Sequence, residues 1–313
     1  MQIFGASSHL PANSGPFCAG IGIFDGVHLG HRQLLAKVRE LAAAEHVGSL
    51  AYTFDPHPAK VLSPHQAPKL IEPLHDRLER LAALGLDATL IEPFDGEFAA
   101  LSARAFVQSV LVEKLNVRHV VVGTNFTFGH KAAGNARLLG ELGRQFGFGV
   151  HGLDLVQTGT LPISSTSIRT LVDRGDVDQA RGLLGRNFAI YGAVVRGARR
   201  GTAIGVPTAN IIAENELLPK TGIYATLATG QFGQDLPSVT NIGYSPTFGK
   251  NPLRIETYVM DRQLPPLYGQ TVAVAFVKRL REELRFDGVD ALVAQIQKDI
   301  ADARAELSLA HAV

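Results

Sequence analysis

The spacing of hydrophobic positions changes near residue 185 of this 313-residue chain. Before that point, short apolar runs alternate with longer segments whose apolar residues recur at helical spacing. The predicted strands are residues 20–23, 49–54, 87–91, 119–123 and 149–156. The predicted helices are residues 30–42, 70–84, 102–115, 136–147 and 172–184, the last with a break at Gly175-Asp176. This order predicts a doubly wound α/β domain, preceded by a polar lead-in over residues 1–15.

From residue 186 the helical spacing gives way to short alternating runs separated by Gly and Pro. The predicted strands are residues 189–195, 208–212, 222–229, 238–242, 254–260 and 270–276. Six short strands in succession predict a small six-stranded antiparallel β-barrel. An apolar stripe that begins with Val289 and Leu292 predicts a C-terminal helix packed on this barrel. We therefore expect two domains, residues 1–185 and residues 186–313.

Composition and charge narrow the class of protein. A hydrophobic content of 46% with 19% charged residues is typical of a soluble globular protein. The formal net charge of +1 gives no overall attraction to nucleic acid or to anionic membranes, so we expect neither as a partner. Cys18 is the only cysteine, which excludes an intramolecular disulfide and argues against a cysteine-based zinc site. With no signal peptide and no long apolar run in the sequence, a cytoplasmic protein is expected.

The most informative stretch is Gly20 to Leu35, where a predicted strand runs through a glycine turn into a helix. Gly26 permits a tight turn, and His28 and His31 lie in the loop and in the first turn of the helix. A helix start offers unpaired N–H groups and the positive end of its dipole, which suits a phosphate. The alternative is a strand-to-helix turn with two solvated histidines, but the spacing of the histidines after a glycine turn favours nucleotide chemistry.

Two other loops follow predicted strands and should lie at the same edge of the sheet. The second strand runs into Asp55-Pro56-His57-Pro58, where the prolines alone would explain a rigid turn as well as a ligand contact would. The strand 119–123 runs into a loop in which Asn125 stands beside Phe126 and Phe128. A small polar side chain beside two aromatics could hold a ring and a sugar or phosphate, whereas the alternative is a simple glycine turn.

Hydroxyl side chains gather at the start of a later helix. Ser164, Ser165 and Thr166 precede Arg169 by one helical turn. A single Ser or Thr here would be an ordinary helix cap. Several hydroxyl groups with an arginine in the next turn are better explained by a phosphate cradle.

The second domain opens with a glycine- and arginine-rich stretch over residues 192–210. Such a loop could fold over phosphates, although a tight barrel turn with solvated charges would look the same. The stretch ends in Thr208 and Asn210, whose side-chain oxygens are the hard ligands that Mg²⁺ accepts together with phosphate oxygens. The candidate residues in this stretch are Gly197, Arg200, Gly205, Pro207, Thr208 and Asn210.

The last candidate functional residue is a carboxylate on a later predicted strand. In the strand 254–260, Glu256 and Tyr258 share one face, opposite Ile255 and Val259. A glutamate that faces solvent on an edge strand is the simplest interpretation. The charged run at residues 279–283 is predicted to be a solvated face.

Taken together, these motifs resemble the bacterial bifunctional riboflavin kinase/FAD synthetase family over roughly residues 16–305. Phe24-Asp25-Gly26-Val27-His28-x-Gly30-His31 resembles the signature of the nucleotidylyltransferase superfamily in its FAD synthetase branch. Residues 163–169 resemble its phosphate box, and residues 192–210 and 241–249 resemble the riboflavin kinase module. The resemblance implies a Rossmann-like nucleotidylyltransferase domain followed by a six-stranded antiparallel barrel with a C-terminal helix.

For the first domain, the resemblance implies transfer of AMP from ATP to the phosphate of FMN, which yields FAD and pyrophosphate. His28 and His31 would stabilise charge on the α-phosphate, while Ser164, Ser165, Thr166 and Arg169 would hold the outgoing phosphates. Many members carry an acidic residue where this chain has Asn125. The implied contacts to ATP and its phosphates also include Gly22, Phe24, Asp25, Gly26 and Asn125.

For the second domain, the resemblance implies phosphorylation of riboflavin to FMN with ATP and Mg²⁺. Thr208 and Asn210 would hold the metal–nucleotide, and Glu256 would take the proton from the riboflavin 5′-hydroxyl. Members often have His where this chain has Tyr258. Two alternatives remain: a first domain that acts on another phosphate acceptor, and a flavin-binding regulator with a silent site. A monomer or weak homo-oligomer is expected.

Overall fold

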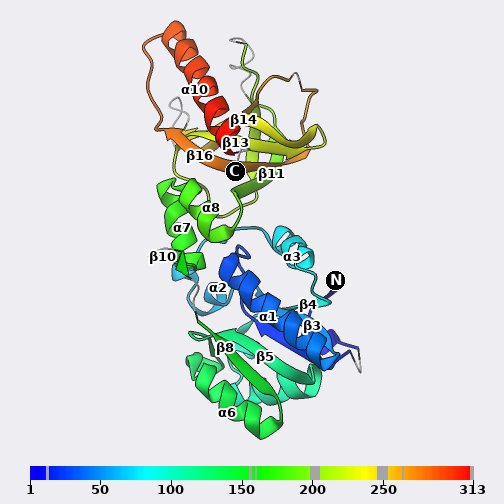
Figure 1. Ribbon diagram of the computed structural model, residues 1–313. Helices are drawn as coiled ribbons and strands as arrows, with labels where there is room; N and C mark the ends of the chain where they lie inside the picture. The colour runs from blue at the N-terminus through cyan, green and yellow to red at the C-terminus, as the bar shows by residue number, and fades with distance from the viewer. Residues whose placement is uncertain are drawn as a thin grey trace. The chain divides into compact units, whose positions relative to one another are not determined.

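The computed structural model describes residues 1–11, 14–154, 157–158, 161–197, 205–244, 253–262 and 264–310 (Figure 1). The chain folds as two compact units. The first unit comprises Met1–Lys69 and Leu74–Ser164. The second unit comprises Leu70–Pro73 together with the chain from Ser165 onward. Within the described residues, no helix combines the length and the apolar character needed to cross a membrane.

The first unit is built on a six-stranded parallel sheet with the order β1-β4-β3-β2-β5-β8. Its strands are β1 Gln2–Phe4, β2 Phe17–Ile21, β3 Gly48–Asp55, β4 Ala88–Pro93, β5 Val117–Gly123 and β8 Gly149–Leu153. The strand order confirms the predicted doubly wound domain. The sequence pattern gave no sign of β1, because three residues on a sheet edge are too few to show a periodicity.

Helices cover both faces of this sheet. On one face, Leu35 and Val38 of α1 (Leu29–Glu45) and Leu81 of α3 (Leu74–Ala83) pack in one cluster with Cys18. On the other face lie α5 (Ala103–Phe106), the π-helical segment Val107–Lys114 that continues it, and α6 (Ala136–Phe146). The short elements are Ser7–His9, α2 Pro58–Leu62, Pro64–Gln66, α4 Gly96–Ala99, β6 Thr127–Phe128, His130–Ala132, β7 Gly134–Asn135, β9 Gln157–Thr158 and β10 Leu161–Pro162.

The second unit is a closed antiparallel barrel with the strand order β11-β12-β15-β14-β13-β16, as predicted. Its strands are β11 Phe188–Val195, β12 Ala209–Ala213, β13 Gly222–Gly230, β14 Gly233–Tyr244, β15 Leu253–Val259 and β16 Thr271–Arg281. Its helices are α7 Ser165–Arg174, α8 Val177–Leu184 and α10 Val289–Ala310. Ala303 and Leu307 of α10 are buried against the barrel, as expected.

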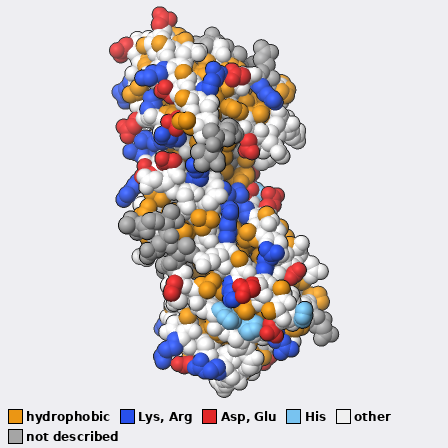
Figure 2. Space-filling view, in the orientation of Figure 1, with side chains coloured by type: hydrophobic (Ala, Val, Ile, Leu, Met, Phe, Trp, Pro, Cys, Tyr) orange, Lys and Arg blue, Asp and Glu red, His pale blue; other side chains and the backbone are white. Residues whose placement is uncertain are grey.

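The compact units divide after Ser164, earlier than the boundary that the change of pattern predicts near residue 185. The physical reason is packing: α8 lies against β11 and β16 of the barrel, and α7 packs on α8. Helical spacing in the sequence therefore continues into the second unit. On the face drawn in Figure 2, basic and acidic side chains are interspersed on both units, in keeping with the net charge of +1.

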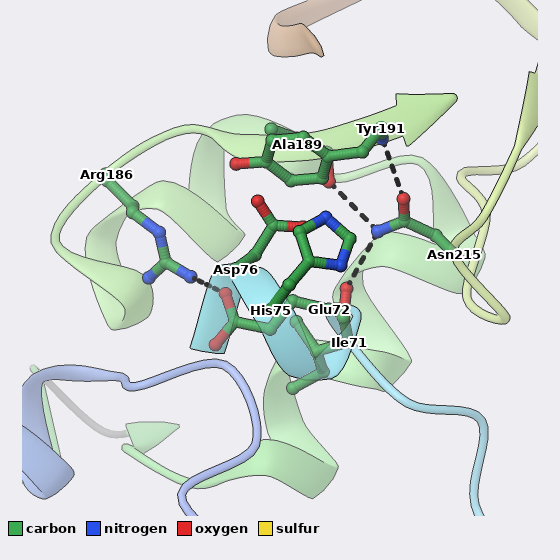
Figure 3. Close-up of polar contacts among 8 residues, drawn as sticks. All are labelled: Ile71, Glu72, His75, Asp76, Arg186, Ala189, Tyr191 and Asn215. Carbon is green, nitrogen blue, oxygen red and sulfur yellow. Dashed lines mark hydrogen bonds and ion pairs between the residues drawn. The ribbon is translucent and has the colours of Figure 1, made fainter. Parts of the chain in front are cut away.

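The short segment Leu70–Pro73 belongs to the second unit because side chains of that unit bind its backbone (Figure 3). The amide Nδ2 of Asn215 donates to the carbonyl oxygens of Ile71 and Ala189, both at 3.2 Å. Its Oδ1 accepts from the Tyr191 N–H at 2.8 Å. One buried side chain thus satisfies three backbone groups, and the predicted helix 70–84 starts only at Leu74.

An ion pair reinforces the same segment. The guanidinium of Arg186 donates from Nη2 to Oε2 of Glu72 at 2.8 Å (Figure 3). The Glu72 side chain is fully buried, so its charge must be paired to be tolerated there. The segment is therefore held both by its backbone and by a buried charge.

We predict that Asn215→Ala destabilises the second unit by about 1–3 kcal/mol, because three backbone groups lose their partner and the bond to the Ile71 carbonyl is buried from water. The measurement is urea unfolding of the full chain, followed by hydrogen exchange of second-unit peptides. Glu216→Gln is the control, since its exposed side chain keeps an oxygen that can accept from the Leu70 N–H. Equal unfolding midpoints for Asn215→Ala and the control would contradict the assignment.

Candidate active sites

The first candidate site lies at the carboxyl edge of the parallel sheet. From β2 the chain proceeds to β3 and β4 on one side, whereas β5 and β8 lie on the other. The strand order therefore reverses between β2 and β5, and open α/β sheets bind ligands in the crevice at such a point. The loops after β2 and β5 flank this crevice, and they carry His28 and Asn125.

The turn after β2 has an unusual backbone. Phe24, Gly26 and Val27 have φ angles of 53°, 84° and 36°, in the region that favours glycine. Phe24 and Val27 tolerate this conformation while fully buried, and the Val27 N–H donates to the Phe24 carbonyl at 3.0 Å. Asp25 is buried in the same turn, and Gly22 precedes it with Phe24 packed over its Cα. The turn is therefore a rigid, preformed element.

The two histidines lie together where the turn enters α1. His28 is the N-cap residue: its Nδ1 accepts from the His31 N–H at 3.3 Å. The two imidazole rings stack with their centroids 3.5 Å apart and 16° between their planes. Because Nδ1 of His28 accepts a hydrogen bond, the neutral ring carries its proton on Nε2 and can donate from there. The sequence prediction of two adjacent imidazoles at a helix start agrees with this geometry.

The charge state of His31 follows from its surroundings. Burial, then the neighbouring His28 and the Arg77 guanidinium, hold the pKa of His31 well below its ordinary value. His31 is therefore neutral at neutral pH and can act by hydrogen bonding.

Two residues of this site were missed in the sequence. Thr53 Oγ1 and Arg77 Nη1 each donate to the Ile23 carbonyl at 2.9 Å, directly before the turn. Arg77 lies on the buried face of α3, one turn before Leu81. An arginine among the apolar positions of a helix was the signal that could have identified it.

Two other predicted residues, Asn125 and His57, lie in the loops that follow β5 and β3. Asn125 is exposed in the loop after β5, where Phe126 and Phe128 stack with centroids 5.5 Å apart. His57 Nδ1 accepts from the Ala59 N–H at 3.1 Å and so begins α2, which supports the interpretation of that loop as a rigid turn.

The predicted phosphate cradle is divided between the two units. Ser164 closes the first unit, whereas Ser165, Thr166 and Arg169 lie in the first turns of α7 in the second. Their approach to the histidines stays a prediction.

The second candidate site is a cavity of about 1020 Å³ in the second unit. Antiparallel pairing places Asn210 of β12 opposite Glu256 of β15, and Glu256 opposite Asn241 of β14. Directly paired residues point to the same side of a sheet, so the three side chains form a row, and all three line the cavity. Glu256 is therefore not on an edge strand, because the barrel is closed.

The remaining predicted residues frame this row. Gly197, Pro207, Thr208 and Tyr258 also line the cavity, whereas Gly205 is not among its lining residues. Arg200 lies outside the described residues.

Two glycines leave room for polar side chains of the cavity. A Cβ on Gly197 would overlap the side-chain amide of Asn210. A Cβ on Gly243 would overlap the carboxylate of Glu283, whose pKa is raised by partial burial. A Cβ at either position would therefore force the neighbouring polar side chain to move.

A buried ion pair joins α10 to the barrel at the cavity wall. Arg281 donates from Nε and Nη2 to the two oxygens of Asp299, at 2.7 and 2.6 Å. Asp299 is buried and also accepts from Gln295 at 2.9 Å. The expectation of a purely solvated charged face at residues 279–283 is therefore wrong for Arg281, because α10 covers it.

The donor set of the cavity is suited to a hard cation. The buried Oδ1 of Asn241 has no hydrogen-bond partner among the described residues, although a buried amide oxygen is costly to leave unpaired. Thr208, Asn210 and Glu256 add hydroxyl, amide and carboxylate oxygens to the same cavity. Oxygen ligands of this kind are those that Mg²⁺ accepts beside phosphate.

Comparisons with known proteins match this architecture. A family model described as FAD synthetase matches residues 11–167, and one described as riboflavin kinase matches residues 184–307. The chain belongs to the bifunctional riboflavin kinase/FMN adenylyltransferase family. It is a two-part transferase of flavin cofactor biosynthesis, with the FAD synthetase part first and the riboflavin kinase part second.

Similar proteins support the assignment over nearly the whole chain. The bifunctional riboflavin kinase/FMN adenylyltransferase of Listeria monocytogenes is 38% identical over 290 residues, which cover 91% of this chain and 90% of that protein. The protein of the same name from Escherichia coli K12 is 37% identical over 284 residues, with 91% and 90% covered. A crystal structure described as a macrolide-efflux protein from Streptococcus pneumoniae has a TM-score of 0.86 at 29% identity and covers 96% of this chain and 98% of that chain.

We predict that acid destabilises the first unit partly through His31. Below about pH 6.5 an unfolded histidine binds a proton, while the lowered pKa of folded His31 resists protonation. The free energy of unfolding should therefore fall as the pH is lowered through this range, by up to about 1.4 kcal/mol per pH unit for one group. Urea unfolding at pH 7.5 and 5.5, read from first-unit peptides, measures this fall. His31→Gln should reduce it and exposed His65→Gln should not; equal falls in both would refute the assignment.

We predict that Gly197→Ala slows riboflavin phosphorylation about ten- to hundredfold, because the new Cβ displaces the Asn210 amide. Initial rates with riboflavin and ATP measure the effect, and FAD formation from supplied FMN should stay unchanged. Gly182→Ala on α8 is the matched control, since nothing lies within 4 Å of its Cβ position. If Gly197→Ala phosphorylated riboflavin at the wild-type rate, the observed position of the Asn210 side chain would not be needed for the reaction.

Proposed function

We propose that the first unit transfers AMP from ATP to the phosphate of FMN and that the second unit phosphorylates riboflavin to FMN. The observation that carries this proposal is that each unit has its own constellation: stacked histidines at a sheet switch point, and a carboxylate–amide row in a barrel cavity. The two family matches, one for each part, support the same division.

In the first reaction, an oxygen of the FMN phosphate attacks the α-phosphorus of ATP and pyrophosphate leaves. His28 is proposed to donate from Nε2 to the α-phosphate, where negative charge develops. His31, being neutral, is proposed to add a hydrogen bond without carrying a charge. The start of α1 contributes backbone N–H groups and its dipole. Gly22, Phe24, Asp25, Gly26, Asn125, Ser164, Ser165, Thr166 and Arg169 are the proposed contacts to ATP and the leaving phosphates.

In the second reaction, Glu256 is proposed to take the proton of the riboflavin 5′-hydroxyl as its oxygen attacks the γ-phosphorus of ATP, with ADP leaving. Asn210 and Asn241 flank Glu256 and would orient the reacting groups. Thr208 and Asn210 would hold Mg²⁺, which neutralises phosphate charge when bound. The glycine- and arginine-rich stretch, with Gly197, Arg200, Gly205 and Pro207, is proposed to bind the nucleotide.

Small molecules are the proposed partners, namely ATP, riboflavin and FMN, with FAD as product. The near-neutral net charge and the single buried cysteine support a cytoplasmic enzyme without a nucleic-acid partner. A monomer or weak homo-oligomer is proposed.

We predict that single substitutions separate the two reactions. His28→Ala should abolish FAD formation and leave riboflavin phosphorylation, because it removes the cap and the donor of the first site only. Glu256→Gln should slow phosphorylation about 10²- to 10⁴-fold and leave adenylylation of supplied FMN. Chromatography of products from riboflavin, ATP and Mg²⁺ measures both.

The matched controls are His65→Ala and Glu141→Gln, both at exposed positions. Loss of both activities in either test variant, with the fold intact, would contradict the two-site assignment. A wild-type chain that makes FMN alone would show that the first unit serves another phosphate acceptor. Flavin binding without ADP formation would indicate a regulator instead of an enzyme.

A further inference from the structure

The turn between β2 and α1 has a backbone conformation that depends on the surrounding structure. Two of its three residues with positive φ, Phe24 and Val27, carry a Cβ that disfavours this region. Such residues persist only where the surrounding structure fixes them. The position of His28, the next residue, depends on what fixes this turn.

The backbone of the turn is fixed at its first carbonyl group. The oxygen of Ile23 accepts two hydrogen bonds at 2.9 Å, one from Thr53 of β3 and one from Arg77 of α3. These donors lie 30 and 54 residues away in the chain. The carbonyl is thus held from the sheet and from a covering helix, and both of its lone pairs are used.

The identity of Arg77 is not explained by stability alone. Its side chain is only 1% exposed, in a position of α3 where an apolar residue would complete the buried stripe. A buried guanidinium is unfavourable compared with a well-packed apolar side chain of similar volume. Its Nε, moreover, has no hydrogen-bond partner among the described residues. The one hydrogen bond that its guanidinium makes to the described residues is the one to the Ile23 carbonyl.

Arg77 also lies close enough to His31 to influence its charge. Arg77 thus binds the backbone that leads to the stacked imidazoles of His28 and His31. We infer that Arg77 is a positioning residue of the adenylyltransferase site, which fixes the Ile23 carbonyl and, through the turn, the stacked pair of His28 and His31. This inference rests on the proposed function of the first unit.

The test is Arg77→Met beside Arg77→Lys in the full chain. Arg77→Met fills the space without a donor or a charge, so kcat for FAD formation from supplied FMN should fall about ten- to hundredfold, with KM for ATP within about threefold of wild type. Arg77→Lys keeps a charged donor and should recover part of kcat. Riboflavin phosphorylation by the same molecules should stay within about twofold of wild type, which verifies that the second unit is folded.

A readout independent of activity is NMR of the histidine ring protons at low temperature, where all variants are folded. The resonances of the stacked pair, assigned with His28→Gln and His31→Gln, should shift in Arg77→Met. They should stay in place in Arg39→Met, a change of the same kind at an exposed position of α1. If wild-type enzyme makes no FAD, the proposed function fails while this readout still tests the positioning.

A purely structural role for Arg77 has a different signature. The melting temperature of Arg77→Met would fall, but its kcat below that temperature and its histidine resonances would match wild type. That outcome would overturn the inference. Equal loss of kcat in Arg77→Lys and Arg77→Met, with unmoved resonances, would overturn it too.

Discussion

The turn from β2 into α1 is the constraint on which the first site depends. It must reverse the chain within a few residues at the sheet switch point and deliver a histidine in position to cap α1. This turn requires positive φ angles at Phe24 and Val27, which are unfavourable for residues with a Cβ. The conformation is stabilised by burial of both side chains and by the two hydrogen bonds to the Ile23 carbonyl. The stacked imidazoles are a consequence of this backbone rather than an independent feature.

The second site obeys a different constraint, which is closure of the barrel. Closure removes edges, fixes the register of β12, β15 and β14, and thereby aligns Asn210, Glu256 and Asn241 across three strands. The polar row lines a cavity that α10 also lines, and the ion pair of Arg281 with Asp299 joins this helix to the barrel. A small fold thus obtains a large pocket by packing a helix against the outside of a barrel.

Most of the fold could be predicted from the sequence because it follows local periodicity. The doubly wound sheet, the six barrel strands and the terminal helix each leave a repeating apolar pattern, and the motif residues indicate both candidate sites. What escaped depends on contacts between distant segments. The strand β1 is three residues long, and Leu70–Pro73 belongs to the second unit, where distant residues such as Asn215 and Arg186 bind it. No local pattern contains that information.

The residues missed at the sites share one property, which is that they act through another residue. Motifs consist of side chains expected to touch substrate, such as His28 or Glu256, whereas Arg77 and Asp299 appear in the sequence only as charges at positions expected to be apolar or solvated. The uncharged state of His31 also makes the residues that position its ring important. An uncharged imidazole that acts by hydrogen bonding depends on the position of its ring, and Arg77 binds the backbone that leads to both rings. A buried charge on an apolar stripe is therefore as informative about a site as the motif itself.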